Sequence, residues 1–161
     1  MAWSILKFTG DEIVKLAVEI EKNGRLFYEK ALAKVDDPDA KRTFIYLAEE
    51  EARHVKDFEK LGESLARDVV PNESYVGEYR DYIKSIIDSH VFNLHKVKDL
   101  VDGIQTFREA LAIAFRFEKD SIMIFQEFKN MVDDTGKDII EKLIQQEKEH
   151  ISKLTQIYRQ P

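Results

Sequence analysis

Two Glu-x-x-His motifs are the part of this sequence whose residue types and spacing could do chemistry. They run from Glu51 to His54 and from Glu147 to His150, and they use two of the chain's four histidines. Residues three apart on a helix lie on one face, so each carboxylate and its imidazole could bind the same metal ion. A single motif would be weak evidence, because a Glu-rich chain contains some by chance. The pair makes metal binding the first hypothesis.

Each motif lies within a stripe of apolar residues at helical spacing. The apolar positions fall seven, four and three residues before the glutamate, and four and seven after it. A buried carboxylate costs free energy unless it is neutralised, paired or bound to a cation. A carboxylate at the stripe's edge that reaches solvent is the alternative, and it suits one glutamate better than several that share a spacing. The stripe residues are Phe44, Leu47, Ala48, Val55 and Phe58, then Ile140, Leu143, Ile144, Ile151 and Leu154.

Four long amphipathic helices are expected to position these motifs. Capping-box sequences begin the first and the third, at Thr9 and Thr106, and Asp37 suits the N-cap of the second. Few glycines and prolines interrupt the segments between these signals. Three of the helices are predicted over residues 10–34, 38–64 and 107–131. The fourth is predicted to follow a turn at residues 133–136 and to end near residue 158.

The first and third helices each carry one further glutamate on their apolar face, Glu21 and Glu118, whereas Glu19 falls off that face. Gly24 in mid-helix costs about 1 kcal/mol relative to alanine, which makes sense where another backbone or a ligand comes close. The apolar face of the third helix is predicted to consist of Leu111, Ala114, Phe115, Ile122 and Phe125.

The link between the second and third helices differs from the rest of the chain. Residues 68–74 are predicted to form a loop, and the apolar pattern of residues 75–94 predicts one shorter extra helix. Neither His90 nor His95 has a carboxylate at metal-binding spacing, so both are predicted to be surface or interface residues. The apolar content of the extra helix exceeds the needs of a solvated linker, and a homodimer is therefore expected.

The two halves of the chain are related by an internal repeat. A shift of 97 residues places Glu21 on Glu118 and Tyr28 on Phe125, and with one residue fewer in the turn the two Glu-x-x-His motifs coincide. A shared core pattern explains the apolar matches but not the polar ones. Two antiparallel hairpins packed about a pseudo-twofold axis would bring six side chains together: Glu21, Glu51, His54, Glu118, Glu147 and His150.

This set of side chains predicts a site for two divalent cations. Four carboxylates at one point would repel one another and raise each other's pKa values, and two such ions would neutralise them. Oxygen ligands with one imidazole per ion suit Fe or Mn better than a structural zinc site.

The sequence resembles the ferritin-like superfamily, and most closely the rubrerythrin-like di-iron proteins, over residues 9–158. The resemblance implies an all-α, ferritin-like four-helix bundle of two antiparallel hairpins, with a long crossover and an extra short helix between them. It also implies a single domain over residues 1–161. The residues that carry it are Glu21 with Phe27-Tyr28, Leu47-Ala48 before Glu51-x-x-His54, Glu118, and Glu147-x-x-His150.

The family pattern implies a role for each of these residues. Glu51 and Glu147 would bridge two Fe ions per chain, with Mn as the alternative metal. Tyr28 would lie beside the site as a hydrogen-bond donor or an electron relay, and is the candidate catalytic residue. The remaining ligands would be Glu21 with His54 on one ion and Glu118 with His150 on the other.

Two departures from the family pattern change what is expected. Full-length rubrerythrins carry a cysteine-ligated rubredoxin domain, but this chain has no cysteine. Electrons are therefore expected from a separate donor, such as a rubredoxin-like protein. Rubrerythrins also carry an extra glutamate where this chain has Ser121, and a neutral hydroxyl is a poor ligand for a ferric ion. Both motif histidines are thus expected to remain ligands in reduced and oxidised states.

The resemblance favours a di-iron oxidoreductase that reduces hydrogen peroxide or dioxygen, with a role in oxidative stress. One alternative is a bundle that binds iron for buffering or sensing without turnover, and another is a hydroxylase of the same superfamily. Cage storage is not favoured, because ferritin cages use a fifth helix and this chain stops soon after the fourth.

Composition argues against other classes of protein. A net charge of −6 argues against binding to nucleic acid. The lack of cysteine removes disulfides, thiolate nucleophiles and Fe–S clusters, and it fits a cytoplasmic protein. The first eight residues are too short for a signal peptide, and no apolar run is long enough to span a membrane.

Overall fold

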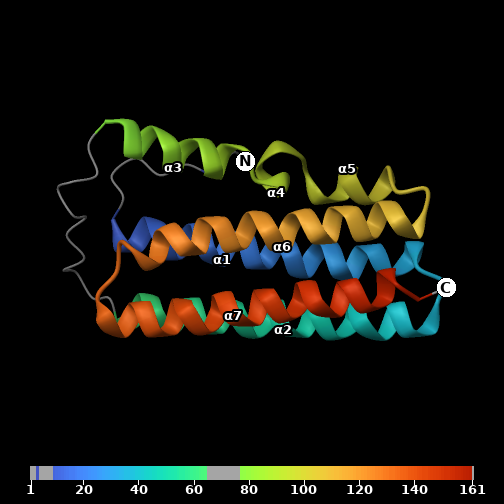
Figure 1. The fold of residues 1–161 in the computed structure, drawn as a ribbon. Coiled ribbons are helices and arrows are strands. Elements are labelled where there is room, and N and C mark those ends of the chain that lie inside the picture. The colour runs from blue at the N-terminus through green and yellow to red at the C-terminus, as the bar shows by residue number, and fades with distance from the viewer. Residues whose placement is uncertain (1–2, 4–8, 65–76, 161) are drawn as a thin grey trace.

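A computed structural model describes residue 3, residues 9–64 and residues 77–160 of the chain. In these ranges four long helices lie side by side and shorter helices cover one face of them (Figure 1). The prediction of an all-α bundle is therefore confirmed. The long helices are α1 (Gly10–Ala31), α2 (Pro38–Ser64), α6 (Phe107–Lys129) and α7 (Asp134–Tyr158), and a short 3-10 helix, η1 (Leu32–Lys34), follows α1.

The starts of α1, α2 and α6 follow the predicted caps, whereas α7 begins at Asp134, inside the predicted turn at residues 133–136, because Asp133 caps it. Thr9 Oγ1 accepts the backbone N–H of Glu12 at 3.2 Å, and Thr106 Oγ1 accepts that of Glu109 at 3.2 Å. In both boxes the glutamate also accepts the N–H of the capping residue. Asp37 accepts a backbone N–H from the first turn of α2 at 2.9 Å. These caps satisfy donors that the helices leave unpaired, so local sequence determines where the helices begin.

Two antiparallel hairpins form the bundle, α1 with α2 and α6 with α7. Contacts between α2 and α7, and between α1 and α6, join the hairpins. The link runs back along the bundle, so α6 begins at the end of the molecule where α2 begins (Figure 1). As a result, α1 is parallel to α7 and α2 is parallel to α6.

The link contains three helices in the described part, and the prediction of one extra helix over residues 75–94 is wrong. These are α3 (Glu78–Asp88), α4 (Val91–Leu94) and α5 (Val97–Asp102). The break lies at His90, whose backbone is extended and whose Nδ1 accepts the N–H of Phe92 at 3.1 Å, which caps α4. The loop predicted at 68–74, and residue 75, lie outside the described residues.

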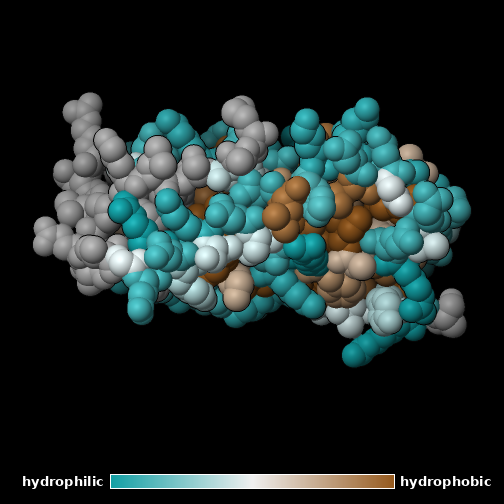
Figure 2. Space-filling view, turned by 90° about the horizontal axis from the view of Figure 1, so that it is seen from above, coloured by the Kyte–Doolittle hydropathy of each residue, from teal (hydrophilic) through white to brown (hydrophobic). Residues whose placement is uncertain are grey.

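Many apolar residues of the link belong to the core of the same chain, but Tyr82 and Leu94 are 46% and 54% exposed. Ile83, Ile87 and Phe92 are buried, α3 and α4 contact α6, and α5 contacts α1. The outer face over these helices is largely hydrophilic, with hydrophobic surface confined to a smaller area (Figure 2). The buried side chains of the link do not support an interface, and the homodimer stays a prediction.

His90 is fully buried, so the prediction that it is a surface or interface residue is wrong. The helical break turns its ring toward α6, where its Nε2 lies 3.1 Å from Ser121 Oγ. Spacing to carboxylates in sequence does not reveal such a contact. His95, by contrast, is exposed as predicted.

Gly24 allows α6 to come close to α1. A Cβ at this position would lie 2.2 Å from Cζ of Phe117, whose ring is fully buried. The close neighbour is therefore a side chain rather than the backbone or ligand that was expected. None of the helices in the described ranges is both long and apolar enough to cross a membrane.

Candidate metal centre

Six titratable side chains meet in the middle of the bundle. Each is at most 1% exposed. They project from all four long helices, because the apolar stripe of each helix faces the bundle axis. They are Glu21 from α1, Glu51 and His54 from α2, Glu118 from α6, and Glu147 and His150 from α7.

The imidazole of His54 lies against three of the carboxylates. Its Nδ1 is 2.7 Å from Glu21 Oε2, 2.8 Å from Glu147 Oε1 and 3.4 Å from Glu51 Oε2. The two carboxylates other than Glu51 come from other helices. Tertiary packing therefore builds this half of the site around one motif.

The imidazole of His150 has a matching set of neighbours. Its Nδ1 is 3.2 Å from Glu51 Oε1, 3.2 Å from Glu147 Oε2 and 3.4 Å from Glu118 Oε2. The two imidazole rings stack, with centroids 5.3 Å apart and planes inclined by 12°.

The six side chains thus form two overlapping groups. Glu51 and Glu147 each turn one oxygen toward each imidazole, whereas Glu21 approaches only His54 and Glu118 approaches only the other histidine. In each group of four, one candidate ligand atom per residue lies within 4.8 Å of the others. This arrangement suits two neighbouring cations that share two carboxylates, although metal binding by these residues stays a prediction.

The hydrogen bonding of these side chains supports a cation site. Nine of their buried nitrogen and oxygen atoms make no hydrogen bond of good geometry in the described structure, including both oxygens of Glu51 and of Glu147, although imidazole nitrogens lie 2.8–3.4 Å from these oxygens. Buried polar atoms are normally paired, and the desolvation of an unpaired carboxylate is expensive. Divalent ions would satisfy these oxygens together. The donor set of carboxylate oxygens and imidazole nitrogens fits Fe or Mn.

Burial and mutual repulsion set the protonation of the four carboxyl groups. Burial, together with the charges of Glu51 and Glu147, raises the pKa of Glu21 and of Glu118 well above the usual range. Burial would also raise the pKa of Glu51 and of Glu147, but the two histidines outweigh it, so both pKa values fall below the usual range. The shared carboxylates are therefore the ionised pair.

The two histidines show the opposite balance. Burial alone would lower the pKa of His54 and of His150. The surrounding carboxylates outweigh burial and raise both pKa values above the usual range. Each imidazole therefore holds a proton that a metal ion would have to displace.

Tyr28 lies beside the site, as the family pattern implied. Its buried hydroxyl donates a hydrogen bond of 2.5 Å to Glu118 Oε1. Burial and the neighbouring carboxylates raise the pKa of Tyr28 well above its usual value, so it remains a neutral donor. Phe125, its counterpart in the repeat, has no hydroxyl. The hydroxyl of Tyr28 therefore contacts Glu118, and in the described part of the chain no matching hydroxyl contacts Glu21.

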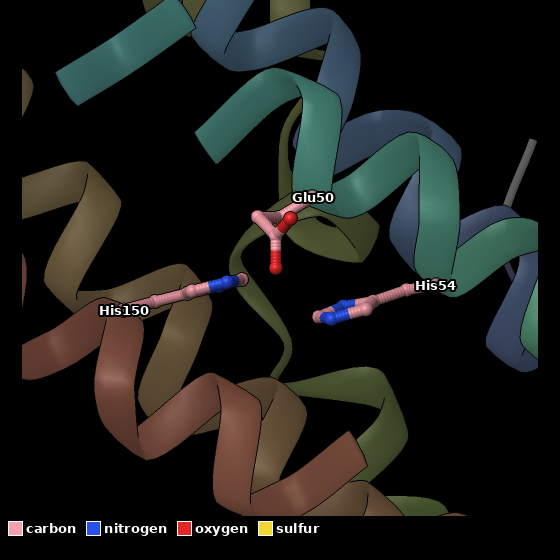
Figure 3. A group of neighbouring side chains, drawn as sticks. All are labelled: Glu50, His54 and His150. Carbon is pink, nitrogen blue, oxygen red and sulfur yellow. The ribbon is translucent and has the colours of Figure 1, made fainter. Parts of the chain in front are cut away.

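Glu50 is a carboxylate near the site that sequence reasoning missed. It points between the rings of His54 and His150 (Figure 3), and atoms of the three residues lie within 4.8 Å of one another. It is 7% exposed and forms an ion pair with Arg53. The Nε2 atoms of both imidazoles are buried without a hydrogen-bond partner in the described ranges. If the rings bind a metal ion through Nδ1, the carboxylate of Glu50 is a nearby acceptor that could orient them. Its place next to Glu51 in the sequence was the available signal.

Ser121 is fully buried one turn beyond Glu118. Its hydroxyl faces Nε2 of His90 at 3.1 Å. His90 Nδ1 accepts a backbone N–H, so the ring proton lies on Nε2 and is donated to the serine oxygen. A neutral hydrogen-bonded pair therefore occupies the position where rubrerythrins carry the additional carboxylate.

These helices and this shared ligand set define a ferritin-like bundle with a carboxylate-rich candidate dimetal site. The chain belongs to the rubrerythrin family, because the family model named Rubrerythrin matches residues 12–100. The matched range includes Glu21, Glu51 and His54 and ends before α6.

A solved structure extends the comparison to the whole chain. A protein from Thermotoga maritima, described as a ferritin-like diiron-carboxylate protein, aligns with 98% of this chain and 99% of its own. The TM-score is 0.76 and the sequence identity is 27%. Among curated proteins, none gives a significant match.

Proposed function

We propose that this protein is a di-iron carboxylate oxidoreductase that reduces hydrogen peroxide or dioxygen with electrons from a separate donor. The observation that carries the proposal is the sharing of Glu51 and Glu147 between two otherwise separate ligand groups. Membership of the rubrerythrin family and the likeness to a protein described as a diiron-carboxylate protein support iron as the metal.

The residues present fit a pair of iron ions. Glu51 and Glu147 would bridge them, and one histidine and one further glutamate would complete the ligands of each ion. A bound pair of iron ions supplies two electrons and stabilises negative charge that develops on oxygen. The side chains hold the ligand oxygens in a water-poor interior, where Tyr28 keeps a proton at Glu118 Oε1.

Burial of the site favours a small substrate. All six candidate ligands are at most 1% exposed, and the rings of Phe27, Phe44 and Phe117 surround Tyr28. Peroxide and dioxygen are small enough to reach such a site through brief opening of the packing. An organic substrate would need a formed pocket at the ligands.

Anaerobic protein loaded with two Fe(II) per chain tests the proposal. Hydrogen peroxide should oxidise the iron faster than it oxidises free Fe(II), and a reductant should restore the starting spectrum over repeated cycles. Glu51→Ala should abolish cycling. Glu49→Ala is the matched control, because Glu49 is an exposed neighbour on the same helix.

The same experiment separates the proposal from iron buffering or sensing. A protein that only holds iron would retain Fe(II) without rapid oxidation, or would be oxidised once and fail to cycle. Either result would refute the oxidoreductase and leave the metal-binding bundle as the function.

A further inference from the structure

The geometry points to an electron route from the surface to the candidate metal centre through the rings of Trp3, His90, Phe117 and Tyr28. Trp3 is the outer redox-active residue of this route, and Tyr28 is the inner one. This inference deepens the proposed function and rests on it, because that function needs electrons from outside the bundle.

Trp3 is the only tryptophan in the sequence. Two successive hydrogen bonds connect its backbone to the link. Its backbone N–H donates to Asn93 Oδ1 at 2.8 Å, and Asn93 Nδ2 donates to the carbonyl of Ile87 at 3.1 Å. Its ring packs on the core but is only partly buried. It lines a surface cavity of about 640 Å³ together with Phe92 and Lys96. The indole can therefore exchange electrons with a donor outside the protein.

Ring contacts connect Trp3 to Tyr28. The ring centroids of Trp3 and His90 are 4.9 Å apart, those of His90 and Phe117 are 6.0 Å apart, and those of Phe117 and Tyr28 are 6.1 Å apart. These centroid separations are typical of aromatic pairs in contact. Phe92 adds a parallel connection, 5.8 Å from His90 and 4.9 Å from Phe117.

Two features hold the middle of the route in one geometry. His90 is fixed at both nitrogens, by the N–H of Phe92 and by the hydroxyl of Ser121. Burial, with a smaller effect of Arg116, lowers the pKa of His90 to about 3. The ring therefore stays neutral and adds no electrostatic barrier to electron transfer. Phe117 lies against the surface of α1 where Gly24 leaves room for its ring.

The inner end of the route has a proton acceptor. When Tyr28 gives one electron to the oxidised site, its hydroxyl proton moves along the 2.5 Å hydrogen bond to Glu118 Oε1. Trp3 then gives one electron to the tyrosyl oxygen, which takes the proton back. The oxidised indole loses its N–H proton to water in the cavity. A one-electron donor, such as a small iron protein, and a proton from water restore Trp3.

Transfer between the two ends can be measured without metal redox chemistry. Azide radicals from pulse radiolysis oxidise tryptophan, and the test uses protein loaded with redox-inert Zn(II). The indolyl radical should convert to a tyrosyl radical in a first-order step that does not depend on protein concentration. Tyr28→Phe should remove this step, and Tyr158→Phe should preserve it, because Tyr158 is a half-exposed surface residue outside the route.

Iron-loaded protein provides the second measurement. Peroxide takes two electrons and the iron pair supplies both, so the readout is the rate at which an external one-electron donor then reduces the oxidised iron. Trp3→Phe should slow this reduction at unchanged metal content. Trp3→Tyr should restore that reduction, because tyrosine can be oxidised and phenylalanine cannot.

The two measurements separate failure of the route from failure of the proposed function. Radical conversion that survives Tyr28→Phe, or equal donor-driven reduction in wild type and Trp3→Phe, would overturn the route. If peroxide and a reductant fail to cycle the iron between its two oxidation states, the proposed function is overturned. The Zn(II) experiment would still decide whether an electron passes between Tyr28 and Trp3.

Discussion

Metal loading should release about four protons per chain at neutral pH. The raised pKa values of Glu21 and Glu118 leave a proton on each carboxyl group, and the raised pKa values of His54 and His150 leave one on each imidazole. All four protons must leave before these side chains can bind cations. The site is neutral both before and after loading, because two divalent ions replace two imidazolium charges and balance two newly ionised carboxylates.

The proton count sets the pH dependence of metal binding. Since binding releases protons, affinity should rise with pH and fall as the solution becomes more acidic. Each released proton contributes about 1.36 kcal/mol per pH unit. Four protons therefore change the combined binding free energy of two ions by about 5 kcal/mol per pH unit, a factor of about 10⁴ in the product of the two association constants.

Calorimetric titration with Mn(II) measures this count, because Mn(II) is not oxidised during the experiment. Titrations in buffers of different ionisation enthalpy give the number of protons released. Glu118→Gln should release about one proton fewer and bind more weakly, while Glu49→Gln should match the wild type. Release of fewer than about two protons would show that the carboxyl groups are already ionised and that the charge balance described above is wrong.

Four further outcomes are expected. Each filled metal site should stabilise the fold by about 2.7 kcal/mol at a hundredfold excess over Kd, and so raise Tm by about 5–10 °C in thermal melts. Glu51→Ala should lose bound metal in elemental analysis, while Glu49→Ala keeps it; equal occupancy would place Glu51 outside the site. Gly24→Ala should lower the free energy of unfolding in urea by about 2 kcal/mol, since overpacking against Phe117 outweighs the gain of about 1 kcal/mol in helix propensity. Crystal structures of reduced and oxidised protein should show both histidines bound in each state, because Ser121 offers no carboxylate to draw a metal away; a metal that leaves its imidazole would contradict this.

The starts of α1, α2 and α6 and the faces that carry the candidate ligands could be predicted from sequence because both depend on local features. A capping residue and its partner lie three positions apart, and a helical stripe repeats within a few residues. Glu21, Glu51 and Glu118 therefore lie where their helical phase places them, inside the bundle. The bulk of the fold follows from pairing four such stripes.

Features that depend on the docking of the link could not be predicted in the same way. On α6 the predicted face included Phe115 and Ile122, which are only partly buried, and it omitted Phe117, which is fully buried. Helices α3 and α4 cover a second side of α6, so its buried surface is wider than one stripe. The burial of His90 has the same origin, because only the folded link brings it to Ser121.

Tyr28 and its counterpart in the repeat, Phe125, differ by one hydroxyl group. This hydroxyl makes the two halves of the repeated structure chemically unequal. A hydrogen bond to Glu118 withdraws electron density from that carboxylate, so it is the weaker donor to a cation than Glu21. The two positions should then fill in sequence and differ in reduction potential. A molecule of peroxide lying across them would meet a stronger electron donor on one side than on the other. Duplicated hairpins that differ at this residue thus give a symmetric scaffold a built-in direction for electron flow.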